Sequence, residues 1–311
     1  MSGIKRVKDF STQKVRLMVE GNWLPSFDIE IHQGGFDILE LHRGEYEDFS
    51  FLVPHAEKIQ ALWINAPSKS SKGLEKLREL RLLSLSYEIG KDINFAAFPK
   101  LTDVSFDAWY PWYENSLFAN QKLEAIRIEG YDKPDCAEFG KLSGLRKLVL
   151  AKGRVKSLEG LRTCMKLEEI QLAHLRQLDD ISEVAYIPTL LRVELNDVLP
   201  KLVNFDVLFS KAALEALVIV GPPTSIDNIR WLEKFRNLEI LRLQIPVEEV
   251  NWDLLFTSPK LRKVVVMSAK PLSITEDEIR AIGTKHNLRV SEVTVFGTKK
   301  KPSWLIELAF P

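Results

Sequence analysis

The chain has 311 residues, 45% of them hydrophobic and 28% charged, a globular composition too long for one ordinary core. Its 43 basic and 43 acidic side chains balance in each half, with 22 of each sign in residues 1–155 and 21 of each in residues 156–311. Because nucleic-acid-binding domains normally carry an excess of positive charge, this balance argues against a nucleic-acid partner. The run Lys299–Lys301 is interpreted as a solvated tail.

Targeting and anchoring signals are missing from the sequence. No run approaches the 18 apolar residues of a membrane span, so no membrane partner is expected. The first 21 residues are charged throughout and lack the apolar core of a secretory signal. The only cysteines are Cys136 and Cys164, too few for a disulfide framework. We therefore expect a cytoplasmic protein.

The first predicted element is an N-terminal cap over residues 1–35. Residues 14–21 and 26–35 both alternate apolar and polar side chains, as half-buried strands do. They are joined through Gly21, Asn22 and Pro25, which favour a turn. The pattern predicts a β-hairpin that covers the first coil of the body that follows.

The body of the chain is a repeat of the apolar pattern LxxLxL. The pattern begins twelve times, at Phe36, Ile59, Leu80, Leu101, Leu123, Leu145, Leu167, Leu190, Leu214, Leu238, Leu261 and Val290. Each start follows the previous one by 21 to 24 residues, except for a last step of 29. A period of this size is typical of a solenoid, in which each repeat is one coil.

This unit resembles the leucine-rich-repeat family, which places a short strand at LxxLxL. The short step and stretches such as residues 225–243 resemble the internalin-like bacterial group. The resemblance implies an α/β solenoid: a curved array of about twelve coils with a parallel concave sheet. The family usually has Asn or Cys at the ninth position of the repeat, forming a ladder of side-chain bonds to the backbone. Here the ninth positions include Pro67, Trp109, Tyr131, Gly153 and Leu175, so irregular coils are expected.

The segments that return from one strand to the next carry apolar residues at every third position. Residues 155–164 and 226–235 are examples. Because side chains of a 3₁₀ helix eclipse at this spacing, the pattern predicts 3₁₀ turns on the outer side of the coils. Cys164 falls in this pattern and is interpreted as a small core residue.

The stretch FDAWYPWYEN, residues 106–115, places two Trp-Tyr pairs around Pro111. Proline disfavours a helix interior and a central strand, so the stretch is predicted to be the loop after the fourth strand. Trp109 is expected to turn inward where a ladder Asn would lie. Each ring carries a large surface, and Trp and Tyr are enriched in binding hot spots. We therefore predict that at least two of the four rings are accessible and contact a partner.

The chain is predicted to close with residues 273–311, the last repeat and a C-terminal cap, after repeats over residues 36–272. Thr275 and Glu278 have capping-box spacing, and Gly283 is expected to terminate the helix that they begin. This helix accounts for the long last step of the repeat. The apolar run in residues 302–310 predicts a closing strand.

The sequence offers no recognisable catalytic site. Neither phosphate-binding glycine motif occurs, and the five histidines are scattered without metal-ligand spacing to cysteine. His42 and Glu40 could share one strand face as an acid–base dyad, and Asp103, Ser105 and Asp107 could face a hard cation. A solvated or protein-binding face is the commoner use of such residues. We predict no enzyme activity, no catalytic residue, no metal and no cofactor.

The fifth position of LxxLxL and the residue directly after the pattern, which is the seventh position of the repeat, are predicted to face away from the core, onto the concave sheet. There they mix small residues and charges of both signs, with an apolar C-terminal end. The predicted partner-binding residues join this face to the aromatic loop. They are Trp63, Tyr87, Asp103, Ser105, Asp107, Trp109, Tyr110, Trp112, Tyr113, Arg127, Glu129 and Tyr131.

The resulting hypothesis is a non-catalytic, freestanding protein-binding module, monomeric when free. A binder without other segments acts by occupying a partner's surface, so we expect an inhibitor. An immunity protein that neutralises a toxin is one example among the cytosolic binders of the resembling bacterial group. An adaptor that bridges two partners is the alternative.

Overall fold

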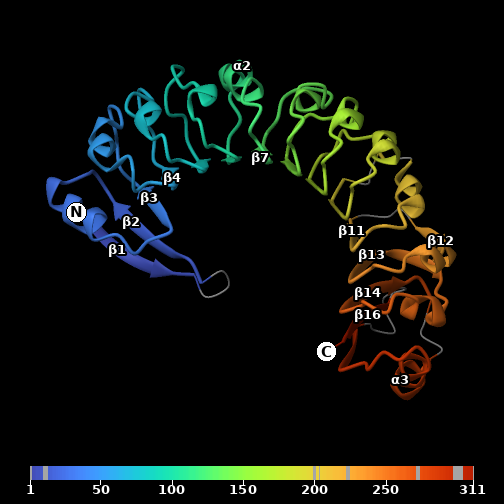
Figure 1. Ribbon diagram of the computed structural model, residues 1–311. Coiled ribbons are helices and arrows are strands. Elements are labelled where there is room, and N and C mark those ends of the chain that lie inside the picture. Colours follow the sequence, from blue (N-terminus) through green and yellow to red (C-terminus); the bar gives the residue numbers. More distant parts are fainter. Residues whose placement is uncertain are drawn as a thin grey trace. The chain divides into compact units, whose positions relative to one another are not determined.

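The computed structural model describes the chain except residues 1, 10–12, 199–200, 203, 222–224, 271–273, 297–303 and 311, so Lys299–Lys301 lies outside the described residues. The chain divides into two compact units. Unit 1 comprises Met1–Asp132 and Lys141–Arg146, and unit 2 comprises Lys133–Gly140 and Lys147–Pro311. In each unit the strands lie on one side of the coils and the short helices on the other (Figure 1).

Unit 1 contains seven of the described strands, which pair in chain order. The strands are β1 Gly3–Lys8, β2 Val15–Glu20, β3 Ile38–His42, β4 Ala61–Asn65, β5 Leu82–Leu85, β6 Asp103–Phe106 and β7 Ala125–Glu129. The return segments hold α1 Asp28–Gln33, α2 Glu114–Phe118 and the 3₁₀ helices η1 Pro25–Phe27, η2 Ser50–His55, η3 Leu74–Lys76, η4 Phe95–Ala97 and η5 Pro111–Tyr113. From β2 to β7 every described pairing is parallel.

Unit 2 continues the same pattern with different ends. Its strands are β8 Lys147–Ala151, β9 Glu169–Ala173, β10 Arg192–Asn196, β11 Ala216–Val220, β12 Ile226–Asn228, β13 Ile240–Glu249, β14 Lys263–Ser268, β15 Glu292–Phe296 and β16 Trp304–Ala309. Its helices are η7 Leu161–Thr163, η8 Ser182–Tyr186, η9 Phe205–Ser210, η10 Arg230–Lys234, η11 Trp252–Phe256 and α3 Glu276–Lys285; η6 Phe139–Lys141 lies where the units meet in sequence. The 3₁₀ helices between the strands confirm the 3₁₀ turns that the three-residue apolar period of the return segments predicts.

The repeat pattern defines the core as predicted. From Ile59 to Val266 the first, fourth and sixth positions of every LxxLxL unit are buried. Strand alternation sends the fourth and sixth side chains inward, and parallel stacking aligns them with their counterparts in neighbouring coils. Burial of apolar area on this scale is the main stabilising term of the fold.

The N-terminal cap is a β-hairpin, but not between the predicted segments. β1 pairs antiparallel with β2, and β2 pairs parallel with β3. Residues 28–33, predicted as a strand, form α1 instead. Phe27 and Ile31 are buried at helical spacing, whereas Ile29 is 63% exposed, so the alternation of this segment does not mark one buried strand face.

The C-terminal cap corrects two further expectations. Thr275 and Glu278 form the predicted capping box, but α3 continues past Gly283 to Lys285. Gly283 is buried, and a Cβ there would lie 2.8 Å from Cγ2 of Val290, so close packing explains this glycine. The closing strand β16 pairs antiparallel with both β14 and β15, and therefore β15 does not stack on β14 as a last parallel repeat.

Both cysteines lie in the core of unit 2. Cys164 is fully buried and its thiol donates a 3.4 Å hydrogen bond to the carbonyl of Phe139. Burial raises the pKa of Cys164 to about 11 and also raises the pKa of Cys136. The interpretation of Cys164 as a core residue is confirmed.

We expect neither cysteine to react with a thiol reagent at pH 8 while the protein is folded. With a pKa of about 11, only about one Cys164 side chain in a thousand is a thiolate at that pH, and burial also blocks access. Ellman titration with and without guanidinium chloride tests this expectation. Two equivalents should appear only after unfolding; rapid reaction in native buffer would contradict the core assignment.

Leu148→Asp should unfold the protein or lower its melting temperature by many degrees, because it places an unpaired charge in the core at a cost of several kcal/mol. Leu148 is fully buried in β8, whereas its neighbour Val149 faces the other side of the strand and is only partly buried. Val149→Asp is the matched control and should change thermal unfolding little. Equal melting temperatures for the two variants would show that the inward face is assigned wrongly.

Candidate interaction surface

The outward face of the unit 1 strands carries one row of side chains in register. Glu40, Trp63, Ser84, Ser105 and Arg127 are successive partners across β3 to β7. All five occupy the fifth position of their repeats. Because the fourth and sixth side chains enter the core, the fifth must point to the opposite face. The predicted row is therefore confirmed.

Part of this face is hollowed into a depression of about 630 Å³. The bulky Trp63 and Arg127 are separated along the row by two serines, whose small side chains leave the space open. Its lining consists of His42, Arg43, Trp63, Asn65, Ser84, Ser86, Tyr87, Ser105, Asp107 and Arg127. Tyr87 is 51% exposed, so one of the aromatic rings that line the depression is accessible to a partner.

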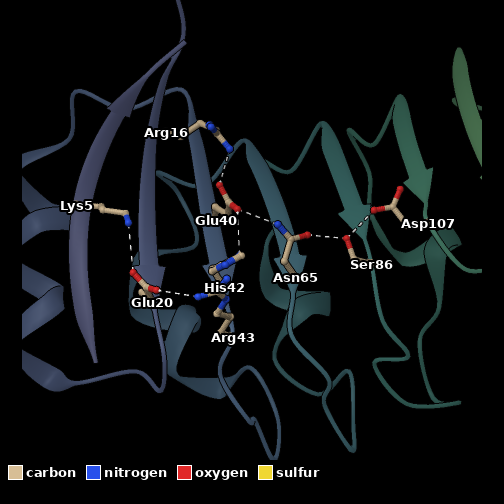
Figure 2. A network of polar contacts seen from close by, with 9 residues as sticks. All are labelled: Lys5, Arg16, Glu20, Glu40, His42, Arg43, Asn65, Ser86 and Asp107. Carbon is tan, nitrogen blue, oxygen red and sulfur yellow. Dashed lines mark hydrogen bonds and ion pairs between the residues drawn. The ribbon is translucent and has the colours of Figure 1, made fainter. Parts of the chain in front are cut away.

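A polar network enters the depression from a buried carboxylate (Figure 2). Glu40 is only 3% exposed. Its Oε2 accepts a 2.8 Å hydrogen bond from the guanidinium of Arg16, and its Oε1 accepts a 2.8 Å bond from Nδ2 of Asn65. The ion pair with Arg16 and the hydrogen bond from the Asn65 side chain compensate the buried charge of Glu40, which would otherwise be strongly destabilising. Arg16 also lies over the ring of Trp63, 5.2 Å from its centroid.

The same network continues to the far side of the depression. The Ser86 hydroxyl lies 2.7 Å from Oδ1 of Asn65 and 2.8 Å from Oδ2 of Asp107. Arg127 donates a 2.7 Å bond to Oδ1 of Asp107 and lies 3.6 Å from Glu129. These contacts fix the rotamers of residues that project from successive strands.

A second ionic group borders the first. Glu20 pairs with Lys5 at 3.3 Å and with Arg43 at 3.6 Å (Figure 2). The hydrogen bond from Lys5 is the largest cause of the lowered pKa of Glu20. All three side chains are exposed enough for solvent to weaken the pairs, so their effect is to place charge rather than to stabilise the fold.

The aromatic stretch after β6 is divided between core and surface. Trp109 and Tyr113 are buried, and Trp109 donates a 2.9 Å hydrogen bond from its indole nitrogen to Asp132. Burial raises the pKa of Tyr113, whose oxygen accepts a 3.4 Å bond from the backbone of Ile89. The inward orientation expected for Trp109 is confirmed.

Three predicted contact rings are therefore structural. Trp109 and Tyr113 pack against each other and against Phe106, and Tyr131 packs against Trp109, at centroid separations of 5.4 to 6.3 Å. Tyr131 is fully buried. Trp109 and Tyr131 are ninth positions of their repeats, so the place of the family's ladder Asn is filled here by a large aromatic side chain, and all three predicted contact residues are buried in the free protein.

Tyr110 and Trp112 are the accessible rings of this stretch. They stack on each other at 5.0 Å, and the ammonium of Lys91 lies 4.8 Å above the ring of Trp112. Trp112 is 36% exposed and Tyr110 is partly buried. Neither lines the depression. Pro111 begins η5, which precedes α2 on the side of the coils away from the strands (Figure 1).

The structure thus gathers five of the predicted residues in the depression: Trp63, Tyr87, Ser105, Asp107 and Arg127. Glu129 joins through its ion pair, whereas Asp103 lies on β6 outside the lining and accepts a hydrogen bond from Thr102. Residues missing from the prediction are His42, Arg43, Asn65, Ser84 and Ser86. All but Arg43 occupy fifth or seventh positions of the repeat, so this position was the signal for them.

The alternative chemistries have little geometric support. His42 Nδ1 lies 3.7 Å from Glu40, too far for a hydrogen bond, and this carboxylate already holds Arg16 and Asn65. Asp107, one end of the proposed cation face, is held by Arg127. Within the described ranges no three His, Cys, Asp or Glu side chains gather as metal ligands, and no helix has the length and apolarity to cross a membrane.

Comparisons with known proteins identify the architecture. No family model matches the sequence, and no curated protein matches it. An internalin (InlF) from Listeria monocytogenes shares 13% identity, with a TM-score of 0.53 over 79% of this chain and 78% of the internalin. The Toll–Spätzle complex of Drosophila gives 14% identity and a TM-score of 0.54 over 79% of this chain and 35% of that one. Together with the stacked parallel strands, these similarities show that the protein has the leucine-rich-repeat fold.

Proposed function

We propose that the protein is a non-catalytic module that binds and inhibits one partner protein, using the depression on the strand face of unit 1. The observation that carries this proposal is the network from Arg16 to Arg127, which holds polar side chains in place around accessible aromatic surface. Side chains that are already ordered lose little entropy when a partner docks. Aromatic and arginine side chains together are typical of binding hot spots.

A protein partner also suits the fold. The structure with a similar fold is that of the Toll–Spätzle complex, so a chain of this fold occurs there in a complex with a partner. The depression here is shallow and open on the strand face, and its lining mixes charge, hydroxyl and aromatic groups. Such a surface matches the polar rim and aromatic anchors of protein interfaces.

We further propose that binding inhibits the partner. An immunity protein that neutralises a toxin is the example of such an inhibitor. The stacked pair of Tyr110, which is partly buried, and Trp112, which is exposed, would add a second contact through the aromatic loop. The two buried, unpaired cysteines are compatible with a cytoplasmic, reducing environment. The protein would be a monomer when free. An adaptor that bridges two proteins is the competing function, and stoichiometry separates the two.

The test uses the full chain as an immobilised bait in lysate from its source organism. A partner bound through the depression should be retained by the wild type and lost with Tyr87→Ala combined with Arg127→Glu. Tyr186→Ala is the control. Tyr186 is 60% exposed on η8, and it belongs to unit 2, whereas the depression is lined by residues of unit 1. The purified pair should form a 1:1 complex without partner activity. A ternary assembly with both partner activities intact would replace the inhibitor with an adaptor.

We expect Tyr87→Ala and Trp112→Ala to weaken the complex while the melting temperature stays nearly constant, because both rings are accessible. Loss of a hot-spot ring costs about 2 kcal/mol, or some thirtyfold in affinity. Tyr113→Ala should instead lower the melting temperature by several degrees, because its ring is fully buried. Calorimetric titration and thermal unfolding of the three variants measure both effects. Unchanged affinity for Tyr87→Ala would move the interface off the depression, and unchanged affinity for Trp112→Ala would remove the aromatic loop from it.

A further inference from the structure

Unit 2 has a hollow of its own, of about 480 Å³, where two of its strands end. Its lining consists of Lys152, Gly153, His174, Arg176 and Gln177. These residues follow β8 and β9, whose last paired residues are Ala151 and Ala173. Because the two strands are parallel and in register, the two loops leave the sheet side by side, and the hollow lies between them.

A missing side chain explains why this hollow is open. Gly153 is the ninth position of its repeat. In the next two repeats the ninth positions are Leu175 and Val198, and both side chains are fully buried. Glycine has no side chain to fill the equivalent space. The coil of β8 therefore leaves a gap that the following coils fill.

Two long polar side chains border the gap at positions where the backbone favours glycine. Lys152 and His174 are the eighth positions of adjacent repeats, with φ values of 52° and 55°. Their backbone N–H groups donate to the carbonyls of Ala173 and Asn196, at 2.9 and 2.8 Å. This left-handed conformation is uncommon for residues other than glycine. The stacked coils thus hold both side chains beside the gap despite a conformational cost.

The lining is rich in hydrogen-bond donors and contains no carboxylate. Lys152 and Arg176 are cations that can only donate. Asp197 lies next to the lining, with Oδ2 3.2 Å from Nδ1 of His174, so Nε2 is the imidazole atom left for a ligand. Lys152 has a further interaction within the chain. Arg176 is exposed and forms no hydrogen bond or ion pair with any residue that the structure describes.

These donors fit a planar anion with two acceptor oxygens. A guanidinium binds a carboxylate through two parallel N–H···O bonds, and the Gln177 amide offers a further donor. A phosphate dianion would bring two negative charges close to Asp197, whereas a carboxylate brings one. The chemistry of the hollow therefore favours a carboxylate.

We propose that this hollow binds the carboxylate of an aspartate or glutamate side chain of the partner protein, with the Arg176 guanidinium as its direct ligand. The proposal rests on the proposed function only for the source of the carboxylate. It adds to the depression of unit 1 a contact in unit 2 that requires an acidic residue on the partner's surface.

The test uses the free full-length protein at constant pH. Nα-acetyl-glutamate N-methylamide is titrated, and the Cε1–H signal of His174, assigned among the five histidines with His174→Gln, is followed by NMR. The aspartate analogue should also bind. The glutamine analogue, which has the same shape without the charge, should not shift the signal. We expect saturable, millimolar binding that Arg176→Gln weakens about tenfold, the usual effect of losing a charged hydrogen-bond partner.

A matched variant separates this site from general attraction between charges. Arg154→Gln removes an exposed arginine from the loop after β8, outside the lining, and should leave binding unchanged. The proposal would be overturned by no saturable response to the glutamate analogue, an equal response to the glutamine analogue, tighter binding of inorganic phosphate, or equal effects of the two arginine variants.

The captured partner tests the source of the carboxylate. Arg176→Glu should weaken the purified complex about tenfold, whereas Arg154→Glu should change its affinity little. Equal affinities of these two variants would show that the partner does not supply the carboxylate, and would overturn the proposal. Capture of no protein by the bait would contradict the proposed function alone, because the glutamate analogue is titrated into the free protein.

Discussion

The stacking of coils with their strands in parallel register is the constraint on which the rest of the structure depends. Each coil buries its apolar side only against its neighbours, so every strand must present the same positions inward. Strand alternation then leaves no freedom for the fifth position, which must point outward at every coil. The core and the outward face are therefore two consequences of one repeat. A side chain that fails to pack affects the surface row as well as the stability.

The register gives the unit 1 face its chemical character. Equivalent positions recur from strand to strand at about 4.8 Å, close enough for side chains of one row to bond directly. Asn65, Ser86 and Asp107 come from three successive coils, more than 20 residues apart in sequence, yet they form consecutive contacts. The hydrogen bonds along such a row restrict the rotamers of side chains that would otherwise be mobile on the surface. It also has a buried carboxylate at one end, which accepts a hydrogen bond from the side-chain amide of Asn65.

Much of this architecture was predictable because it repeats. Apolar spacing was enough to place the buried positions from Ile59 to Val266 and the outward row of Trp63, Ser84, Ser105 and Arg127. The caps do not repeat, and there local pattern was ambiguous. Residues 26–33 alternate like a strand, but Phe27 and Ile31 also lie one helical turn apart and the helix prevails. The predicted helix end at Gly283 is wrong, because this glycine is required by its close contact with Val290, which depends on the tertiary fold.

The candidate site was harder to predict because Glu40, the buried carboxylate of its polar network, does not have the solvent exposure expected at its position in the repeat. Glu40 occupies an outward fifth position, yet the N-terminal hairpin brings Arg16 over it and removes it from solvent. Neither fact is visible in the repeat, since the hairpin lies outside it. A buried ion pair of this kind adds little net stability, because desolvation offsets the attraction between the charges. Its consequence lies instead in orientation: the Glu40 carboxylate accepts a hydrogen bond from Nδ2 of Asn65, and the Asn65 amide oxygen therefore faces Ser86. The cap that closes the core thereby also determines which hydrogen-bonding groups the outward face presents.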